Sequence, residues 1–288
     1  MISKPFAAAV CAVLLASPAL AADLPSRKAP PVMAPIPVMT WNGFYVGLNA
    51  GYAWGDANFN VSPGGVWLGS ADGLGVAMAG AQSLSLSGGT VSGTIGYNYE
   101  FAPFVAGVEL DGGWMGLRNS ASAGPFASAA VAGGAYGVNM SASSSYLMTL
   151  RGRLGYEITP SLLAFVAGGL AGSDVNALQS IWFSYPGGGG GRIALVPGVA
   201  GWETGAVSGM RVGWTVGGGL EWMFAPHWSA KIEYLYADFG KQDAMSAFIA
   251  PNGALFAADH QFSRNVNVVR AGLNYHFNLG AAPVVAKY

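Results

Sequence analysis

Residues 209–239 read GMRVGWTVGGGLEWMFAPHWSAKIEYLYADF, two alternating segments that fold back on a tight turn containing Pro226. One face of this pair is apolar and rich in aromatic side chains: Met210, Val212, Trp214, Val216, Leu220, Trp222, Ile232, Tyr234 and Tyr236. The opposite face carries Arg211, Glu221, Lys231 and Glu233, together with Thr215. A period of two indicates β-strands. Charges on one face and apolar side chains on the other are typical of a membrane barrel, with lipid outside and a polar lumen inside.

The composition supports a membrane protein that crosses with strands. Of the 288 residues, 52% are hydrophobic and only 9% are charged, against roughly 25% charged in ordinary soluble domains. The mean hydropathy is +0.39, yet no apolar stretch reaches the roughly 18 residues that a transmembrane helix needs. A closed barrel satisfies the backbone hydrogen bonds that lipid cannot. The formal net charge of −1 gives no reason to expect nucleic acid as a partner.

The N-terminus predicts export. Lys4, the apolar run at 6–15 and the small residues Ala19-Leu20-Ala21 form the pattern of a cleaved signal peptide over residues 1–21. Cys11, the single cysteine, lies inside this segment, so we expect no disulfide in the processed chain. Residues 22–40 hold five prolines and predict an extended periplasmic lead-in. Residues 280–288 form a short C-terminal tail after the last predicted strand.

The remaining sequence alternates between strand-like runs and connections of two kinds. Strands are predicted near 41–54, 90–101, 104–114, 146–158, 162–171 and 265–277, with two more in the hairpin of 209–239. Short turns follow at 102–103, 159–161 and 225–227, whereas 55–88, 115–144, 172–208 and 240–261 are long and rich in small residues. Outer-membrane barrels have even strand numbers, short periplasmic turns and long extracellular loops. The sequence therefore predicts an all-β, eight-stranded antiparallel transmembrane barrel over 41–279, in the outer membrane of a Gram-negative cell, with mobile extracellular loops and periplasmic termini.

Strand parity directs a set of charged side chains into the predicted lumen. They are Glu100, Glu109, Asp111, Arg151, Arg153, Glu157, Arg211, Glu221, Lys231, Glu233 and Arg270. Isolated charges in an interior of low dielectric are costly, so we expect these residues to form cross-strand ion pairs. The third and fourth strands would place Glu109 and Asp111 beside Arg151 and Arg153, and the hairpin would bring Glu221 near Lys231.

Two interpretations of the lumen remain open at this point. Eight strands leave an interior only wide enough for side chains, which favours a packed plug. The alternative is a narrow passage for ions or small solutes, because inward glycines could leave room for water. These glycines are Gly47, Gly51, Gly96, Gly155, Gly217 and Gly219.

Other motifs favour no catalytic or cofactor chemistry. The five glycines at 187–191 lack the Lys-Ser/Thr and helix that follow a phosphate-binding loop, and predict a flexible loop tip. The three histidines show no metal-ligand spacing, so no metal or cofactor is expected. His227-Trp228-Ser229 resembles the His-x-Ser pair of outer-membrane lipid A deacylases, but it falls at a predicted turn with nothing to position a base. We therefore expect no enzymatic activity.

Three segments carry a family resemblance: residues 213–240, Trp41-Asn42-Gly43-Phe44-Tyr45-Val46-Gly47, and Arg270-Ala271-Gly272-Leu273-Asn274-Tyr275-His276-Phe277. Across most of residues 41–279 the chain resembles the alphaproteobacterial small outer-membrane β-barrel family, the Brucella and rhizobial major outer-membrane proteins. Within the last segment, Arg270, Gly272, Tyr275 and Phe277 resemble the signal by which the barrel-assembly machinery recognises its substrates. The chain continues past Phe277, where members of this class usually end.

The resemblance and the composition together predict a structural role in the envelope. The expected partners are outer-membrane lipid and lipopolysaccharide. A weakly selective diffusion channel is the first alternative. The second is a surface protein whose loops bind a host surface, a phage or a ligand, since relatives in this family are described as surface antigens.

Overall fold

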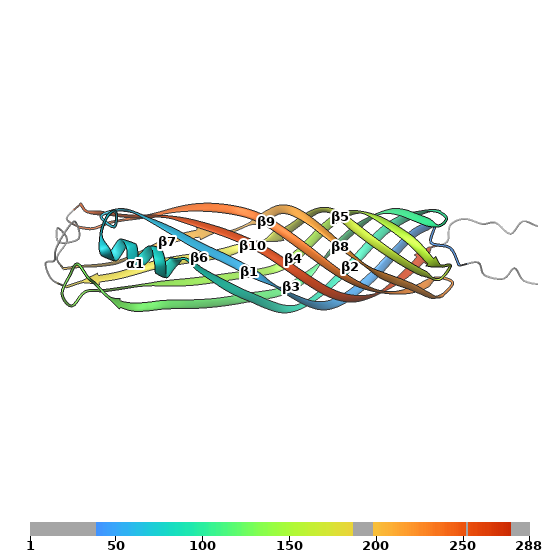
Figure 1. Ribbon diagram of the computed structural model, residues 1–288, viewed down its shortest axis with the longest axis horizontal. Coiled ribbons are helices and arrows are strands. Elements are labelled where there is room, and N and C mark those ends of the chain that lie inside the picture. Colours follow the sequence, from blue (N-terminus) through green and yellow to red (C-terminus); the bar gives the residue numbers. More distant parts are fainter. Residues whose placement is uncertain (1–38, 187–197, 252, 278–288) are drawn as a thin grey trace, which may run out of the picture. The chain divides into compact units, whose positions relative to one another are not determined.

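The computed structural model describes residues 39–186, 198–251 and 253–277, which form an antiparallel barrel with one short helix (Figure 1). The elements are β1 (Gly43–Gly65), α1 (Ala71–Gly80), β2 (Gln82–Phe101), β3 (Phe104–Ala127), β4 (Ala135–Thr159), β5 (Leu162–Asp174), β6 (Asn176–Tyr185), β7 (Val199–Val207), β8 (Met210–Ala225), β9 (Trp228–Ile249) and β10 (Leu255–Phe277). The predicted signal peptide, nearly all of the lead-in, the glycine run at 187–191 and the tail at 280–288 lie outside the described residues.

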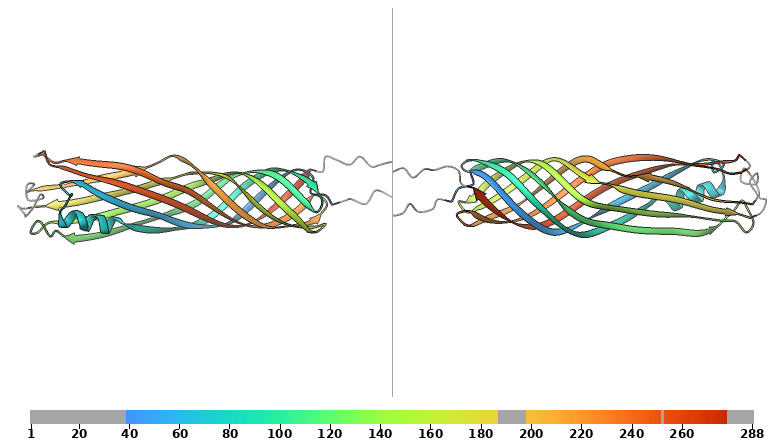
Figure 2. Two further views of the ribbon diagram at one scale, coloured as in Figure 1. Left: turned by 45° about the horizontal axis from the view of Figure 1, so that its top comes forward. Right: turned by 180° about the vertical axis from the view of Figure 1, so that it is seen from behind.

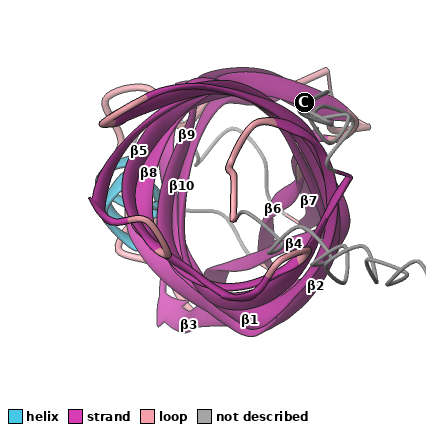
Figure 3. Ribbon diagram, turned by 90° about the vertical axis from the view of Figure 1, so that its right-hand side faces the viewer, coloured by secondary structure: helices cyan, strands magenta, loops and turns pink. Residues whose placement is uncertain are grey.

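Eight strands close into a ring, as the sequence predicts (Figure 3). The order around the ring is β1, β2, β3, β4, β5, β8, β9 and β10, and every neighbouring pair is antiparallel. The first and last strands join it, with Phe44 opposite Phe277 and Trp54 opposite Asn267. Closure removes the open sheet edges that lipid cannot satisfy.

The outer face of this ring is apolar, with aromatic side chains near both ends of the apolar band. On β1, the aromatic residues Phe44 and Trp54 bracket Leu48, which is 71% exposed. Phe44 contacts Tyr97 of β2 edge to face, with 4.8 Å between the ring centroids. A continuous apolar band between aromatic belts is the surface expected to face the hydrocarbon of a membrane. In the described ranges, no helix is long and apolar enough to cross a membrane.

The prediction of long mobile loops is wrong for most of the residues concerned. Beyond the apolar band, β1 continues to Gly65, β9 continues to Ile249, and β10 begins at Leu255 instead of near 265. The period of two persists there, with Leu84 and Leu86 of β2 buried between exposed serines. Because many outward positions there are polar, such as Asn60, Ser62 and Ser85, the lipid-facing signal disappears although the strands continue.

The region 172–208, predicted as a loop, contains the hairpin of β6 and β7. The strand β4 pairs with β5 in its membrane half and with β6 further out, changing partner between Leu147↔Ser173 and Ser143↔Asn176. The outer part of the barrel therefore has β6 and β7 in the place of β5 and β8. Among the described residues, no backbone hydrogen bonds pair β7 with β9. Side chains connect these two strands instead: Glu203 of β7 accepts a hydrogen bond from Ser246 of β9.

The helix α1 and an apolar core fill the outer part of the barrel. Ser70 begins the helix, its hydroxyl accepting a hydrogen bond from the backbone N–H of Gly73. The helix packs against β1 and β4, and Figure 2 shows it at the end away from the short turns. Beside it, the rings of Phe183 and Phe256 stack at 4.3 Å between centroids, and Trp67 packs edge to face against both. By the loop-length rule, this is the extracellular end.

Candidate functional site

The lumen of the membrane half holds a polar network built from inward positions of neighbouring strands. Register places Glu109 of β3 opposite Arg151 of β4, and Glu221 of β8 opposite Lys231 of β9. Residues directly opposite on one face of an antiparallel pair are close enough to interact. Alternation alone therefore brings opposite charges together on adjacent strands.

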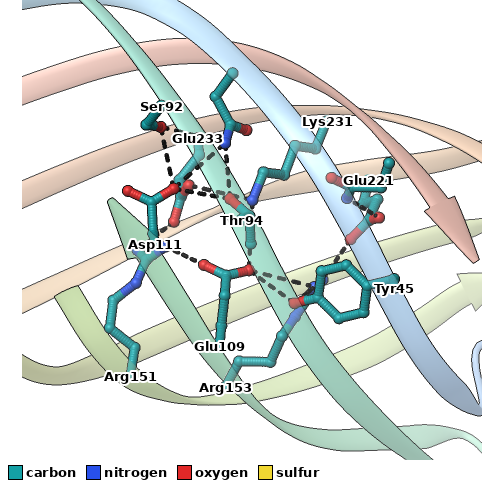
Figure 4. A network of polar contacts seen from close by, with 12 residues as sticks. Tyr45, Ser92, Thr94, Glu109, Asp111, Arg151, Arg153, Glu221, Lys231 and Glu233 are labelled. Carbon is teal, nitrogen blue, oxygen red and sulfur yellow. Dashed lines mark hydrogen bonds and ion pairs between the residues drawn. The ribbon is translucent and has the colours of Figure 1, made fainter. Parts of the chain in front are cut away.

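Arg151 joins two acids of this network (Figure 4). Its guanidinium donates to the carboxylates of Glu109 and Glu233, which come from different sides of the barrel, β3 and β9. The ammonium group of Lys231 lies 3.4 Å from Glu109 Oε2 and 3.7 Å from Glu233 Oε2. Arg151 and Lys231 are 1% and 2% exposed, so these contacts cross the lumen away from water.

Arg153 extends the network toward the short turns. Its Nη2 lies 2.6 Å from Glu221 Oε2, and its Nη1 donates to the Tyr45 hydroxyl oxygen at 3.1 Å. The Tyr45 hydroxyl in turn donates to Glu109 Oε2 at 2.8 Å. The guanidinium also lies over the ring of Phe165, 4.2 Å from its centroid. A planar guanidinium with paired carboxylates and a stacked ring is held in one orientation.

On the extracellular side of Arg151, Arg270 of β10 joins two acids. Its Nη1 lies 2.8 Å from Asp111 Oδ1, and its Nε donates to Glu233 Oε2 at 2.9 Å. The other oxygen of Asp111 accepts from the hydroxyls of Thr94 at 2.7 Å and Ser92 at 3.1 Å (Figure 4). Since Asp111 belongs to β3 and Arg270 to β10, this contact spans the interior over β1 and β2.

Glu221 connects the network to a second polar group. Its Oε1 accepts from the Asn274 amide at 2.6 Å and from the Ser229 hydroxyl at 2.5 Å. The same oxygen lies 3.4 Å from His276 Nε2, which is also 2.9 Å from the Ser229 oxygen. Ser229 is thus buried against His276 and Glu221, and the sequence neighbour His227 instead contacts the backbone oxygen of His276.

The structure brings together eight of the eleven charged residues predicted for the lumen. These are Glu109, Asp111, Arg151, Arg153, Glu221, Lys231, Glu233 and Arg270. Four are acidic and four are basic, so the formal charges of the network cancel. A buried ion pair contributes little net free energy compared with apolar packing, but leaving one partner alone is costly. Because separating these pairs would leave buried charges alone, the ion pairs should stay together and keep the lumen filled.

Three predicted members lie elsewhere, which corrects the sequence interpretation. Glu100 is partly buried near the short turns, where its Oε2 accepts from the Thr40 hydroxyl and the Trp41 backbone N–H, both at 2.7 Å. Glu157 is also partly exposed and lies beside the turn that ends β4, and Arg211 lies at the other end, near the start of β8. Neither forms an ion pair with another described residue. All three have the expected parity, but they lie beyond the centre of the lumen.

One predicted pairing is also wrong. Asp111 contacts Arg270 instead of Arg151 or Arg153, because the residue opposite Asp111 on β4 is Thr149. The uncharged members of the network, Asn49 and Tyr45 among them, did not enter the prediction. Their inward parity on β1 is the signal that identifies them, since each alternates with an exposed apolar residue.

Three of the six inward glycines lie directly beneath a neighbouring side chain. A Cβ atom on Gly47 would lie 2.0 Å from Asn274 Oδ1, and one on Gly155 would lie 2.8 Å from Leu163 Cδ1. A Cβ atom on Gly96 would lie 2.4 Å from the Tyr45 ring. Large neighbouring side chains occupy the space above these glycines. At these three positions the glycines therefore permit close packing of neighbouring side chains.

The residues of the predicted assembly signal all lie on β10. Arg270 points into the lumen, while Phe277 is 41% exposed at the end of the strand, where its ring packs against Tyr275. A Cβ atom on Gly272 would lie 2.2 Å from Asn49 Oδ1. Their recognition by the assembly machinery stays a prediction.

Among the residues that the structure describes, no group of three or more His, Cys, Asp or Glu side chains has the geometry to hold a metal ion.

Comparison with known proteins identifies relatives over nearly the whole length. Residues 7–277 match the family model described as the outer membrane protein beta-barrel domain. The chain is 30% identical over 279 residues to the 31 kDa outer-membrane immunogenic protein of Brucella melitensis biotype 1, covering 92% of this chain and 96% of the relative. It is 23% identical over 262 residues to the 25 kDa outer-membrane immunogenic protein of Brucella abortus biovar 1, covering 90% and 91%.

Solved outer-membrane proteins also match this chain, at low sequence identity. The crystal structure of the outer membrane protein OprG from Pseudomonas aeruginosa matches with a TM-score of 0.41 and 14% identity, covering 84% of this chain and all of that one. Neisserial surface protein A matches with a TM-score of 0.31 and 12% identity, covering 82% and 98%.

Proposed function

The chain belongs to the outer membrane protein beta-barrel family, and from that membership we propose a structural role for it: a closed barrel that strengthens the outer membrane without conducting solutes. The observation that carries this proposal is the filled lumen. Opposite walls are joined in the membrane half by Arg151 between β4 and β9 and by Arg270 between β10 and β3. Moving a solute through would require several buried ion pairs to separate at once, each at a cost of several kcal/mol.

The outer part of the barrel supports the same conclusion by different means. Inside it, buried apolar side chains of α1 and nine strands form one cluster, which includes Trp67, 1% exposed. Buried apolar side chains in proteins pack closely and leave few voids larger than a water molecule. A solute would meet an apolar plug on the extracellular side and a charged plug within the membrane. Two plugs of opposite chemistry exclude both polar and apolar solutes.

Surface exposure is the second part of the proposal. The Brucella relatives are named outer-membrane immunogenic proteins, which implies that parts of those proteins reach the immune system. The strands beyond the apolar band would be the corresponding exposed part here, and contacts with a host surface or a phage would occur there. The lipid-facing band, in turn, would contact phospholipid and lipopolysaccharide.

Planar-bilayer recording of the purified, refolded protein tests the structural role. We expect no steady channel openings from the wild-type barrel. The double variant Arg151→Ala with Arg153→Ala removes two guanidinium groups from the lumen and should allow ion flow. Arg118→Ala, which removes a charge from the outer wall, is the matched control and should remain silent.

Folding of each variant is checked by the slower migration of heat-denatured barrel on gels, because loss of a buried charge can prevent folding. Steady wild-type openings whose amplitude the lumen variants do not change would contradict the proposal and favour the diffusion channel. Openings that appear only in the double variant would support it.

A further inference from the structure

A hollow on the outside of the barrel lies where β4 exchanges β5 for β6. It has a volume of about 680 Å³ and is lined by residues of β3, β4 and β6 and by the end of β7. A smaller hollow of about 240 Å³ adjoins it, and the two share Arg118 and Ser143. The serine side chains here are short, and the wall is therefore recessed beside longer neighbours.

Among the described residues that line the larger hollow, Arg118 is the only cation. Its side chain is exposed and forms no ion pair or hydrogen bond with any described residue. The four lumen cations, by contrast, are each paired with carboxylates. An unpaired guanidinium presents up to five N–H donors in a planar arrangement that suits phosphate.

A row of neutral donors continues from Arg118 across the wall. Register places Arg118 of β3 opposite Ser143 of β4, and Ser143 opposite Asn176 of β6. The next row out contains Ser120 and Ser141, also opposite one another. Hydroxyl and amide groups in two parallel rows can exchange hydrogen bonds with sugar hydroxyls, while the guanidinium binds an anion.

The carboxylate of Asp174, on the neighbouring strand β5, has other donors and no contact with Arg118. Asp174 Oδ1 accepts from the backbone N–H groups of Ser145 and Tyr146, both at 2.8 Å, and from the Ser144 hydroxyl at 3.1 Å. These hydrogen bonds fix the backbone of β4 where its pairing with β5 ends. The Asp174 carboxylate does not line either hollow.

The larger hollow lies directly above the polar layer of a membrane, close enough for one side chain to reach down. Trp114 lines the smaller hollow and pairs across the strands with Tyr146, at the extracellular border of the apolar band. Arg118 lies four residues further along β3, which is roughly 10 Å higher at about 3.3 Å per residue and a tilt of about 40°. The polar layer beside the hydrocarbon is about 5–8 Å thick. The flexible Arg118 side chain therefore reaches it.

We propose that this hollow binds the head group of a phosphorylated, acylated glycolipid of the outer leaflet. Its phosphate would contact Arg118, its sugars would lie along the Ser143 and Asn176 row, and its acyl chains would descend over Trp114 and the apolar band. The inference deepens the proposed function, on which its membrane orientation rests. A soluble phosphate lacks the acyl chains that would use the apolar surface below.

The test uses the whole protein refolded in zwitterionic detergent, with bisphosphorylated lipid A as the probe. Bound lipid is counted by native mass spectrometry over a concentration series. We expect Arg118→Gln to weaken binding about tenfold, the effect of losing one charge-assisted contact. Ser143→Leu, which fills the hollow without changing charge, should weaken it similarly. Lys241→Gln, which removes an exposed cation from β9, is the matched control and should bind as the wild type does.

Dephosphorylated lipid A and inorganic phosphate separate the possible ligands. The proposal expects the dephosphorylated lipid to bind wild-type protein as weakly as lipid A binds Arg118→Gln. Equal lipid A binding by wild type and Arg118→Gln would overturn the proposal. So would inorganic phosphate that competes fully at the concentration of the lipid. Channel recording reports independently on the lumen, so open channels with intact lipid A binding would refute the structural role alone.

Discussion

Replacing Glu203 with glutamine should change how the stability of the barrel depends on pH. Glu203 of β7 is 2% exposed. Its two carboxylate oxygens accept hydrogen bonds from Trp67 Nε1 at 3.1 Å and from the Ser246 hydroxyl at 3.3 Å. His260 Nε2 lies 2.8 Å from the same Ser246 oxygen, and its Nδ1 lies 2.9 Å from Gln179 Oε1. Ser246 has one proton and can donate it to only one of these neighbours at a time.

Burial shifts the two titrating groups in opposite directions. It raises the pKa of Glu203 from 4.5 to about 7, despite the donors Trp67 and Ser246, and lowers the pKa of His260 from 6.5 to about 4. Both groups lie in the extracellular part of the barrel, outside the membrane-spanning band. Each disfavours its charged form in the folded state.

The sign of each contribution follows from proton binding. Between pH 4.5 and 7, folded Glu203 retains a proton that the unfolded chain has released, so stability falls as the pH rises. Between pH 4 and 6.5, folded His260 lacks a proton that the unfolded chain binds, so stability rises with pH. Each slope is at most about 1.4 kcal/mol per pH unit. The two contributions therefore nearly cancel between pH 4.5 and 6.5.

Removing one titrating group should reveal how the other makes the free energy of unfolding depend on pH. Relative to wild type, Glu203→Gln should gain about 2–3 kcal/mol in the free energy of unfolding between pH 4.5 and 7. His260→Gln should lose a similar amount, relative to wild type, between pH 4 and 6.5. Urea titrations of detergent-refolded protein at pH 4, 5.5, 6.5 and 7.5 measure these differences, because the other titrating groups are common to all three proteins. Identical pH profiles, or differences of the opposite sign, would refute the reasoning.

Three further predictions concern packing and capping. Arg151→Met leaves two buried glutamates without their shared guanidinium and should lower the free energy of unfolding by about 3–5 kcal/mol in urea titrations. Gly96→Ala puts a methyl group 2.4 Å from the Tyr45 ring and should cost about 1–3 kcal/mol, whereas Gly93→Ala on the same strand, with its nearest neighbour at 3.9 Å, should be tolerated; equal stability of the two variants would contradict the filled lumen. Ser70→Ala removes the cap of α1 and should destabilise it by about 1 kcal/mol, seen as faster amide hydrogen exchange at Gly73 and its neighbours.

The membrane half of the barrel could be predicted because its signal is local. Lipid outside and polar groups inside impose opposite requirements on successive residues, so Arg151 and Leu150 reveal the two faces without knowledge of their neighbours in space. The same contrast predicts the antiparallel pairing of Glu221 with Lys231, because the turn between them is short. Inward parity likewise predicts Glu109 opposite Arg151 once β3 and β4 are adjacent.

Contacts across the lumen required the closed barrel. Asp111 meets Arg270 because closure and tilt bring β3 and β10 to face one another over two intervening strands, a relation that no local pattern contains. The glycines posed a similar problem. An inward Gly96 is compatible with an empty space or with a ring packed on the backbone, and only the position of Tyr45 distinguishes them.

The sequence alone predicts the strands of the membrane half, which side chains point outward or inward, and the charged interior. Each residue there faces either lipid or lumen, so its own polarity reveals its side. The extent of those strands beyond the membrane, the β6–β7 hairpin and the hollow at Arg118 depend on three-dimensional packing. There the outer face meets water, polar residues such as Asn60 and Ser62 replace the apolar ones, and the lipid-facing pattern is lost. Pairing across β4 and the buried apolar core of α1, Trp67 and their neighbours then hold the structure together, and these contacts join segments far apart in the chain.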